Sequence, residues 1–361
     1  MPHVSRVRWQ IVVMALVWAG LSTPASSQTT GMVEFFAAGK LQRGMPLVDL
    51  AHELVVIGRD GWMHSLDPRQ PETQVRRLEE PFRVASAAEL RNDLRAEFGR
   101  NFEVLATPNF LVVQPRGRGD KWPKLFEQSH RAFVSYMSRR GVNIRQGRFP
   151  MVAVVFPDQQ EMYAEIRKLK IDVSRVAGLY SGDSNRVMTH DGGRSESVAA
   201  TVRHEAAHQS AFNSGVHSRV NDTPRWITEG VGQMFEPVAM TDSRGGSLVS
   251  DRVNRDSLSY IKRKIDQDSD RFRDIVIDLV SGESMFENES SINDAYAVSW
   301  AMMFYLAERN PKAFATMLNH TATRPPFQDY RRQDRIRDLQ RATGDDLYSF
   351  SNRVSRYIDS L

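Results

Sequence analysis

The chain of 361 residues contains no cysteine. This absence excludes disulfide bonds, a lipid-modified cysteine, thiolate ligands to a metal and a cysteine nucleophile. An exported chain of this kind must rely on its core alone for stability. That fits a bacterial periplasm better than a disulfide-dense animal secretion.

Long apolar runs and blocks of one charge are also scarce. Beyond the N-terminal segment, no stretch approaches the ~20 apolar residues that a membrane-spanning helix needs. The net charge is only +4, from 48 basic and 44 acidic residues, and acidic residues interrupt the basic runs. We therefore expect no nucleic-acid partner, because a solvated helix face explains such interspersed charge.

The N-terminus has the pattern of an export signal. Arg6 and Arg8 precede an apolar stretch at 11–21, and small residues follow at 25–27. Such a pattern predicts a signal peptide at residues 1–27, removed by cleavage after Ser27. The alternative is an uncleaved membrane anchor, although the apolar stretch is short for one. We expect an exported protein, periplasmic or secreted, with no stable membrane anchor after cleavage.

The order of predicted elements indicates an α+β fold. Residues 28–99 predict a small N-terminal α/β region, with a hairpin at 52–66 turning at Asp60-Gly61 and a helix at 86–99. Further strands are expected at 102–105, 109–113, 151–156, 178–180 and 186–189. Helices are expected at 122–140, 157–169, 196–214, 224–236, 257–280, 291–309, 311–319, 327–342 and 345–360. Strands in the first half and helices in the second are typical of an α+β arrangement.

The chemically most informative segment is His204-Glu205-Ala206-Ala207-His208. Helix positions four apart lie about 40° apart around the axis and one turn along it, so both imidazoles can reach one metal ion. Glu205 lies about 100° round from His204, where a carboxylate can accept a proton from a water that the metal activates. The alternative is a surface helix with two histidines, because this pattern arises by chance in about one chain in a hundred of this size.

A second segment, 223–230, strengthens the metal hypothesis. Thr223 is expected to cap a helix, with Pro224 in its first turn. The loop before it is short, so the two helices should be antiparallel neighbours, with Glu229 facing both histidines. Two imidazoles and one carboxylate leave the fourth tetrahedral position to water, as a catalytic zinc site requires.

Two glycines follow on the same helix. Gly230 and Gly232 each cost helix stability relative to alanine. Their presence predicts a close approach between helices near the metal.

The paired motif resembles those of the gluzincin peptidases, such as the thermolysin-like and aminopeptidase-N-like enzymes. These have a third ligand in a context like 226–230 (Trp-Ile-Thr-Glu-Gly). A closer likeness, over roughly residues 100–320, is to a group of uncharacterised predicted bacterial peptidases. The resemblance implies a zincin-like domain over 100–361, with a small mixed sheet, a helical C-terminal half and a catalytic core at about 150–320. The Gly-Ala-Met-Glu-Asn motif of exopeptidases is missing from the sequence, which argues against an aminopeptidase.

The same resemblance assigns roles to residues. It implies one Zn²⁺ held by His204, His208 and Glu229, with Glu205 as general base. Similar peptidases carry a tyrosine that donates to the oxyanion in a segment like 295–301, which makes Tyr296 the candidate. The alternative for Tyr296 is a core residue whose hydroxyl binds the backbone.

Other residues are weaker candidates. His217 and His190 could line the site, although loop histidines are usually just solvated. Either Gln233 or Glu236 could orient an imidazole. In related folds an edge strand like 178–189 binds an extended substrate, here through main-chain groups of Arg186–Met188. The alternative is an internal strand without a free edge.

Three interpretations of function remain. The first is an exported zinc peptidase that hydrolyses a peptide or protein substrate. The second is a non-catalytic exported binding or scaffold protein with a relict metallopeptidase fold, but a relict often loses the general base first and Glu205 is present. The third is a binder of nucleic acid or envelope polymer. The sequence does not indicate the substrate, the cleavage specificity, endo- or exopeptidase action, or the oligomeric state.

Overall fold

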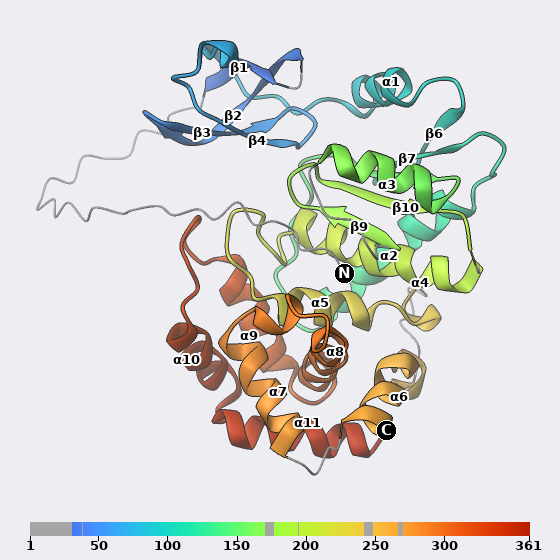
Figure 1. The fold of residues 1–361 in the computed structure, drawn as a ribbon, viewed down its shortest axis with the longest axis vertical. Coiled ribbons are helices and arrows are strands. Elements are labelled where there is room, and N and C mark those ends of the chain that lie inside the picture. The colour runs from blue at the N-terminus through green and yellow to red at the C-terminus, as the bar shows by residue number, and fades with distance from the viewer. Residues whose placement is uncertain (1–30, 38, 170–176, 194, 242–247, 266–269) are drawn as a thin grey trace, which may run out of the picture.

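Two five-stranded sheets and eleven α-helices make up the described part of the chain (Figure 1). The structure is a computed structural model, and it describes residues 31–37, 39–169, 177–193, 195–241, 248–265 and 270–361. The predicted signal peptide lies outside these residues. Within them, no helix combines the length and apolar character needed to cross a membrane. The mixed α+β fold expected from the element order is confirmed.

The N-terminal sheet has the order β4-β3-β2-β1-β5 and is antiparallel throughout. Its strands are β1 (Gly31–Ala37), β2 (Lys40–Leu50), β3 (Glu53–Gly58), β4 (Met63–Leu66) and β5 (Arg76–Pro81), with a 3₁₀ turn η1 (Pro71–Thr73) before β5. The predicted hairpin is confirmed as β3–β4. Its turn contains Gly61 at φ +88°, a conformation that favours glycine. Val33, Phe35, Leu54 and Val56 form a small separate core.

The second sheet is mixed, with the order β6-β7-β8-β10-β9. Its strands are β6 (Phe102–Ala106), β7 (Phe110–Pro115), β8 (Met151–Phe156), β9 (Gly178–Ser181) and β10 (Arg186–His190). β8 pairs in parallel with β7 and β10, and the two outer pairs are antiparallel. Every residue of β8 is buried, as its continuous apolar sequence predicts. β9 is the edge strand next to α4 (Ser195–Asn213), the helix that carries the histidines.

Helices cover both faces of this sheet. Successive side chains along each strand point to opposite faces, so alternate residues contact different helices. On one face, α1 (Ala87–Phe98) and α3 (Gln159–Lys168) pack on Val152, Val154 and their neighbours. On the other face, α2 (Lys121–Arg139) and α4 (Ser195–Asn213) pack around Ala153 and Val155. α1 therefore shares its core with the second sheet, although the expected division at residue 99 grouped it with the first. That division stays a prediction.

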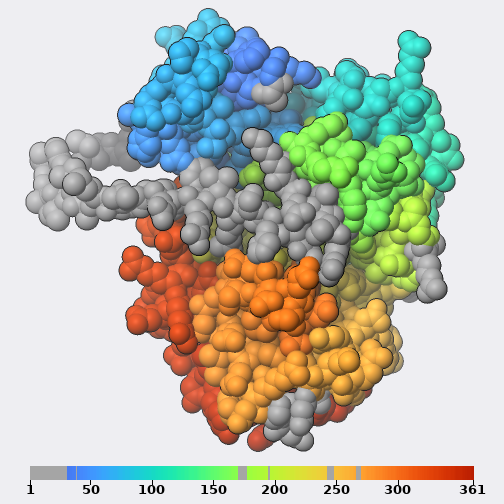
Figure 2. Space-filling view, viewed as in Figure 1, coloured from blue at the N-terminus to red at the C-terminus, as the bar shows by residue number. Residues whose placement is uncertain are grey.

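The C-terminal half is helical and has the largest core. It contains α5 (Arg225–Met234), α6 (Arg255–Lys264), α7 (Asp270–Ser281), α8 (Ile292–Arg309), α9 (Pro311–Ala322), α10 (Arg332–Thr343) and α11 (Leu347–Asp359), with 3₁₀ turns η2 (Val238–Thr241), η3 (Val249–Arg252) and η4 (Ser284–Phe286). α8 is buried along most of its length and packs on α5, α6 and α7. In Figure 2 the N-terminal strands (blue) and the following segment with the second sheet (cyan to green) lie side by side above these helices (orange to red).

Two expected helices differ in the structure. The single helix predicted at 257–280 was wrong, because α6 ends where Ile265 takes an extended, buried conformation and α7 begins at Asp270. The sequence between them is polar, and its aspartates and serine have low helix propensity. The helix predicted at 327–342 begins only at Arg332, because Phe327 has φ +59° and cannot be helical.

A buried ion cluster joins α2, η3 and α8. Glu308, with a side chain only 6% exposed, accepts hydrogen bonds from Tyr136 Oη at 2.8 Å, Arg140 at 2.7 Å and Arg252 at 2.6 Å. Burial acts to raise the pKa of Glu308, but the hydrogen bond from Arg252 and the charge of Arg140 outweigh it and lower that pKa below its ordinary value.

We predict that Glu308→Gln lowers the free energy of unfolding by about 3 kcal/mol at pH 7, because two buried guanidinium groups lose their counter-charge. A carboxylate with a lowered folded-state pKa stabilises the fold above its unfolded pKa, and that stabilisation is lost as pH falls through the folded value. The difference in the free energy of unfolding between wild type and Glu308→Gln should therefore persist down to roughly pH 4.3 and become smaller below it.

Urea titrations at several pH values measure this difference. Glu165→Gln, which removes the exposed partner of Lys168, is the control and should cost less than about 1 kcal/mol. A similarly small cost for Glu308→Gln at pH 7 would contradict the assignment of Glu308 as a buried counter-charge.

Candidate metal centre

The histidine motif lies on α4 where that helix is covered on both sides. The sheet packs on Val198 and Val202, while Ala207 and Ala211 face the core of the C-terminal helices. His204, Glu205 and His208 are consequently buried, at 8–9% exposure. Polar groups at such depth need partners, so each side chain of the motif is expected to be engaged.

The second segment forms α5, and its start differs slightly from expectation. Pro224 occupies the N-cap position that was predicted for Thr223, and it makes no side-chain capping bond. Instead, the Glu283 carboxylate accepts a hydrogen bond from the backbone N–H of Arg225 at 3.2 Å. Arg335 donates to the same carboxylate at 2.5 Å. A distant acid thus caps the helix that carries Glu229, and nothing in the local sequence indicates it.

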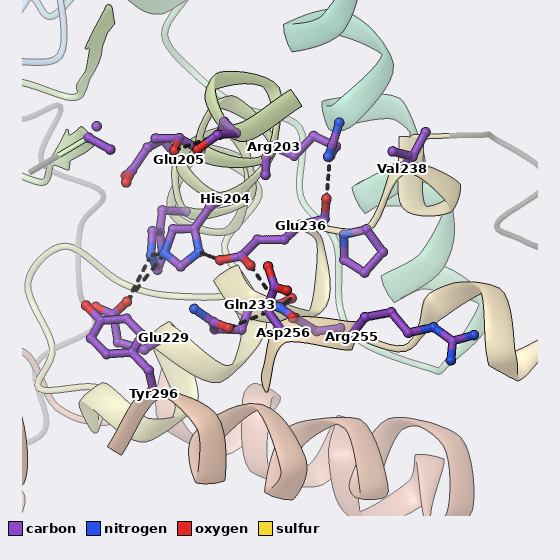
Figure 3. Close-up of a pocket in the computed structure, with 18 of the residues that line it drawn as sticks. Arg203, His204, Glu205, Glu229, Gln233, Glu236, Val238, Arg255, Asp256 and Tyr296 are labelled. Atoms are coloured by element: carbon purple, nitrogen blue, oxygen red, sulfur yellow. Dashed lines mark hydrogen bonds and ion pairs between the residues drawn. The ribbon is translucent and has the colours of Figure 1, made fainter. Parts of the chain in front are cut away.

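The structure brings His204, His208 and Glu229 together as predicted (Figure 3). The Nε2 atoms of the two histidines are 3.0 Å apart, and each lies 3.5 Å from Oε2 of Glu229. The three side chains each offer one ligand atom, and these atoms all lie within 4.8 Å of one another. This group could hold a metal ion.

The imidazoles and the carboxylate also perturb one another. Burial acts to lower the pKa of His204, but hydrogen bonds to Glu229 and Glu236 outweigh it and raise that pKa well above the ordinary value. Burial acts to raise the pKa of Glu229, but the charges and hydrogen bonds of His208 and His204 lower it well below the ordinary value. The carboxylate of Glu229 is therefore held ionised next to two imidazole rings, and an anionic oxygen beside imidazole nitrogens suits a divalent cation.

A second row of side chains orients His204. Glu236 Oε1 lies 2.9 Å from Nδ1 of His204, so Nε2 is left to face His208 and Glu229. Asn254 donates to Oε2 of Glu236 at 2.8 Å and to Oε1 of Gln233 at 3.0 Å. Of the two residues expected to orient an imidazole, Glu236 makes the contact, and Gln233 supports Asn254. Such outer partners set ring orientation and ligand basicity.

The two glycines of α5 lie where helices meet closely, as predicted. A Cβ atom on Gly232 would lie 2.6 Å from Cε1 of His204, and one on Gly230 would lie 2.5 Å from the carbonyl oxygen of Ser299. Both distances are far below a van der Waals contact, so only glycine lets α5 sit between α4 and α8 at this separation.

Gly232→Ala is expected to displace the His204 ring and to weaken metal binding at least about tenfold, the range seen when support for a ligand is lost. The control is Gly282→Ala, where a Cβ meets nothing within 4 Å. Competition titration with a chelating metal indicator measures both affinities. Equal affinities in the two variants would contradict the proposed contact.

Glu205 is tied to the edge strand of the sheet. Its Oε2 accepts a hydrogen bond from the backbone N–H of Tyr180, on β9, at 2.7 Å. Burial raises the pKa of Glu205, and the nearby His204 and His208 only partly offset this. A Cβ on Gly178 would lie 2.5 Å from Cγ2 of Thr201, which shows how closely β9 approaches α4. The carboxylate is thus fixed beside the three ligand atoms without joining them.

The predicted edge strand needs a correction. Arg186–Met188 belong to β10, which pairs with β8 on one side and β9 on the other, so their main-chain groups are already used. The edge belongs to β9, because it lies at the end of the strand order. Local sequence predicted both strands but contains no information about which of them is internal.

Tyr296 reaches the site from α8. It lines the same cavity as the three ligands, and its ring contacts Phe286 edge-on with centroids 5.6 Å apart. Burial, followed by the charge of Glu229, raises the pKa of Tyr296 well above its ordinary value. A hydrogen bond with Glu229 acts in the same direction, so the hydroxyl is engaged with the site.

The two other candidate histidines do not line this cavity in the described residues. His217 is 1% exposed and packs against Phe212, and neither ring nitrogen has a partner among the described residues. Burial lowers the pKa of His217 to about 3, so the ring is a neutral core residue. His190 ends β10, where burial lowers its pKa as well.

The cavity has a volume of about 1210 Å³ and is bordered by β9, α4, α5, α6 and α8. The N-terminal sheet and the loop between α4 and α5 both donate hydrogen bonds to the turn between β9 and β10. Met63 N–H donates to the carbonyl oxygen of Asp183 at 2.8 Å, and Arg219 donates to those of Gly182 and Asp183 at 2.5 and 2.9 Å. These supports were not predicted, because they join segments that are distant in the sequence.

Residues 198–328 match the profile of a family described as "Protein of unknown function (DUF1570)". The matched range includes the histidine motif, Glu229 and Tyr296, but not the second sheet. No curated protein matches the chain. The match agrees with the expected likeness to an uncharacterised family and assigns no activity.

Proposed function

We propose that the chain is an exported zinc-dependent peptidase with a zincin-like catalytic domain. The observation that carries this proposal is the placement of a buried, separately anchored carboxylate, Glu205, beside a His₂Glu group in an open cavity. The mixed sheet, with its edge strand bordering the motif helix, is the arrangement that the gluzincin resemblance implies. Export rests on the sequence pattern of residues 1–27.

The donor set fits zinc. Zinc takes imidazole nitrogen and carboxylate oxygen at about 2.0–2.2 Å, so tetrahedral ligand atoms lie roughly 3.3–3.6 Å apart. The separations here are 3.0, 3.5 and 3.5 Å. Three protein ligands beside a cavity leave room for water, as in catalytic rather than structural zinc sites. When bound, zinc supplies a Lewis acid that makes water a nucleophile near neutral pH.

Glu205 then performs the proton transfers. Glu205 accepts a proton from the attacking water as its oxygen bonds to the scissile carbonyl carbon. The carboxyl group then returns that proton to the leaving nitrogen as the C–N bond breaks. The position of Glu205 favours this role, because its carboxylate is buried beside the three ligand atoms and is held by the N–H of Tyr180. The hydrogen bond from Tyr180 keeps one carboxylate oxygen in place.

Tyr296 has the position and protonation state of an oxyanion donor. Its raised pKa keeps the hydroxyl protonated at neutral pH. A hydroxyl aimed at the developing negative charge on the carbonyl oxygen stabilises the transition state more than the substrate. The edge of β9 would bind the substrate as an additional extended strand.

The proposal predicts that zinc-loaded wild type hydrolyses peptides, and that Glu205→Gln lowers kcat by about 10²–10⁴-fold, the range of general acid–base catalysis. Zinc content of the variant should equal that of wild type, because Glu205 is not a ligand. Mass spectrometry of a peptide pool that is diverse in sequence detects the products whatever the cleavage specificity.

Two outcomes would count against this assignment. Equal hydrolysis by wild type and Glu205→Gln would remove Glu205 as the base. A zinc-loaded wild type that hydrolyses nothing in the pool would favour the non-catalytic binding or scaffold protein.

A further inference from the structure

Arg225 lies beside the metal centre and has no role in the chemistry above. It begins α5, one turn before Glu229, so both side chains emerge on the same face of the helix. Its side chain is half-buried and lines the cavity. The guanidinium carbon lies 4.6 Å from the centroid of the Phe286 ring, and Phe286 in turn contacts the Tyr296 ring. This stacking holds the guanidinium at the Tyr296 side of the cavity.

The charge of Arg225 is not neutralised by a salt bridge within the described residues. The Glu283 carboxylate accepts from the backbone N–H of Arg225 and from the side chain of Arg335. A half-buried guanidinium that forms no salt bridge with a described residue is unfavourable, so its position in an open cavity indicates a ligand.

The two other arginines of the cavity differ from Arg225. Arg203 donates to Glu196 at 2.8 Å and to the carbonyl oxygen of Glu236 at 2.5 Å, so it is fully engaged. Arg255 is exposed, and its hydrogen bond to the carbonyl oxygen of Ser250 is long, at 3.4 Å.

Charged side chains of both signs line the cavity. Figure 3 shows Glu229 and Tyr296 on one side of His204, with Gln233, Asp256 and Arg255 toward the other. Asp251 also lines the cavity near α6. On the other side Arg255 lies beside Asp251 and Asp256, so Arg225 is the cation available to a substrate anion on the Tyr296 side.

We propose that Arg225 binds a carboxylate of the peptide substrate close to the scissile bond and thereby determines specificity. The planar guanidinium donates two parallel N–H bonds to a carboxylate, a geometry that a neutral amide cannot match. The carboxylate comes either from the C-terminus of the peptide or from an Asp or Glu side chain. This inference rests on the proposed peptidase function.

The test uses equimolar pools of otherwise identical peptides. One pool has free C-termini and Gln in a fixed central position. A second has C-terminal amides with the same Gln, and a third has C-terminal amides with Glu in its place. Zinc-loaded wild type should hydrolyse the first or the third pool roughly 10- to 100-fold faster, in kcat/KM, than the second. Preference for the first identifies the terminal carboxylate, and preference for the third identifies the side chain.

Variants separate this role from a structural one. Arg225→Gln should reduce the preference for the carboxylate pool to about one, mainly through KM, while zinc content stays at the wild-type level. Arg225→Lys keeps the positive charge but loses the two parallel N–H donors of the guanidinium, so it should retain part of the preference. Arg255→Gln, in the same cavity, is the matched control and should keep the wild-type ratio.

Binding to zinc-loaded Glu205→Gln protein gives a readout that needs no turnover. Its Kd for the preferred carboxylate pool should be at least about tenfold lower than for the amide pool with Gln, and adding Arg225→Gln should remove this difference. Hydrolysis of all three pools at equal rates would overturn the role of Arg225 and leave the peptidase intact. Selective carboxylate binding without any hydrolysis would support Arg225 and overturn the peptidase.

Discussion

The contact between the His204 ring and the backbone of α5 at Gly232 is the constraint on which the site depends. It brings Glu229 to within 3.5 Å of both histidine Nε2 atoms. A second close approach, between Gly230 and the carbonyl oxygen of Ser299, places α8, and with it Tyr296, next to α5. Since α4 is covered by the second sheet as well, one helix connects the edge strand β9 to the helical half. The geometry of the centre is thus a consequence of how three helices and one strand pack.

The core of the site could be predicted from sequence because its spacing is local. Histidines four residues apart share a helix face whatever surrounds them, and a capped helix after a short loop brings Glu229 opposite. The supporting groups could not be predicted in this way. Glu283, Asn254 and the N–H of Tyr180 reach the site from segments whose positions depend on tertiary packing. The strand order likewise decided that β9, rather than β10, is the edge. The break before α7 was missed because apolar periodicity on both sides obscured a short polar segment.

The charges of the cavity suggest a division of labour. Glu205 and the His₂Glu group are buried, mutually perturbed and fixed by neighbours, as chemistry requires. Arg225 is held by stacking on an aromatic ring and keeps its charge available. In this account the catalytic groups are held rigidly by helix packing, and specificity resides in charges along the cavity wall.

The central claim is that His204, His208 and Glu229 bind one zinc ion. The most direct test is diffraction from crystals of the zinc-loaded protein on both sides of the zinc absorption edge. The account predicts a single anomalous peak within about 2.0–2.2 Å of the two Nε2 atoms and one oxygen of Glu229. Zinc-loaded crystals with no peak at this position, or with zinc only on surface residues, would contradict it.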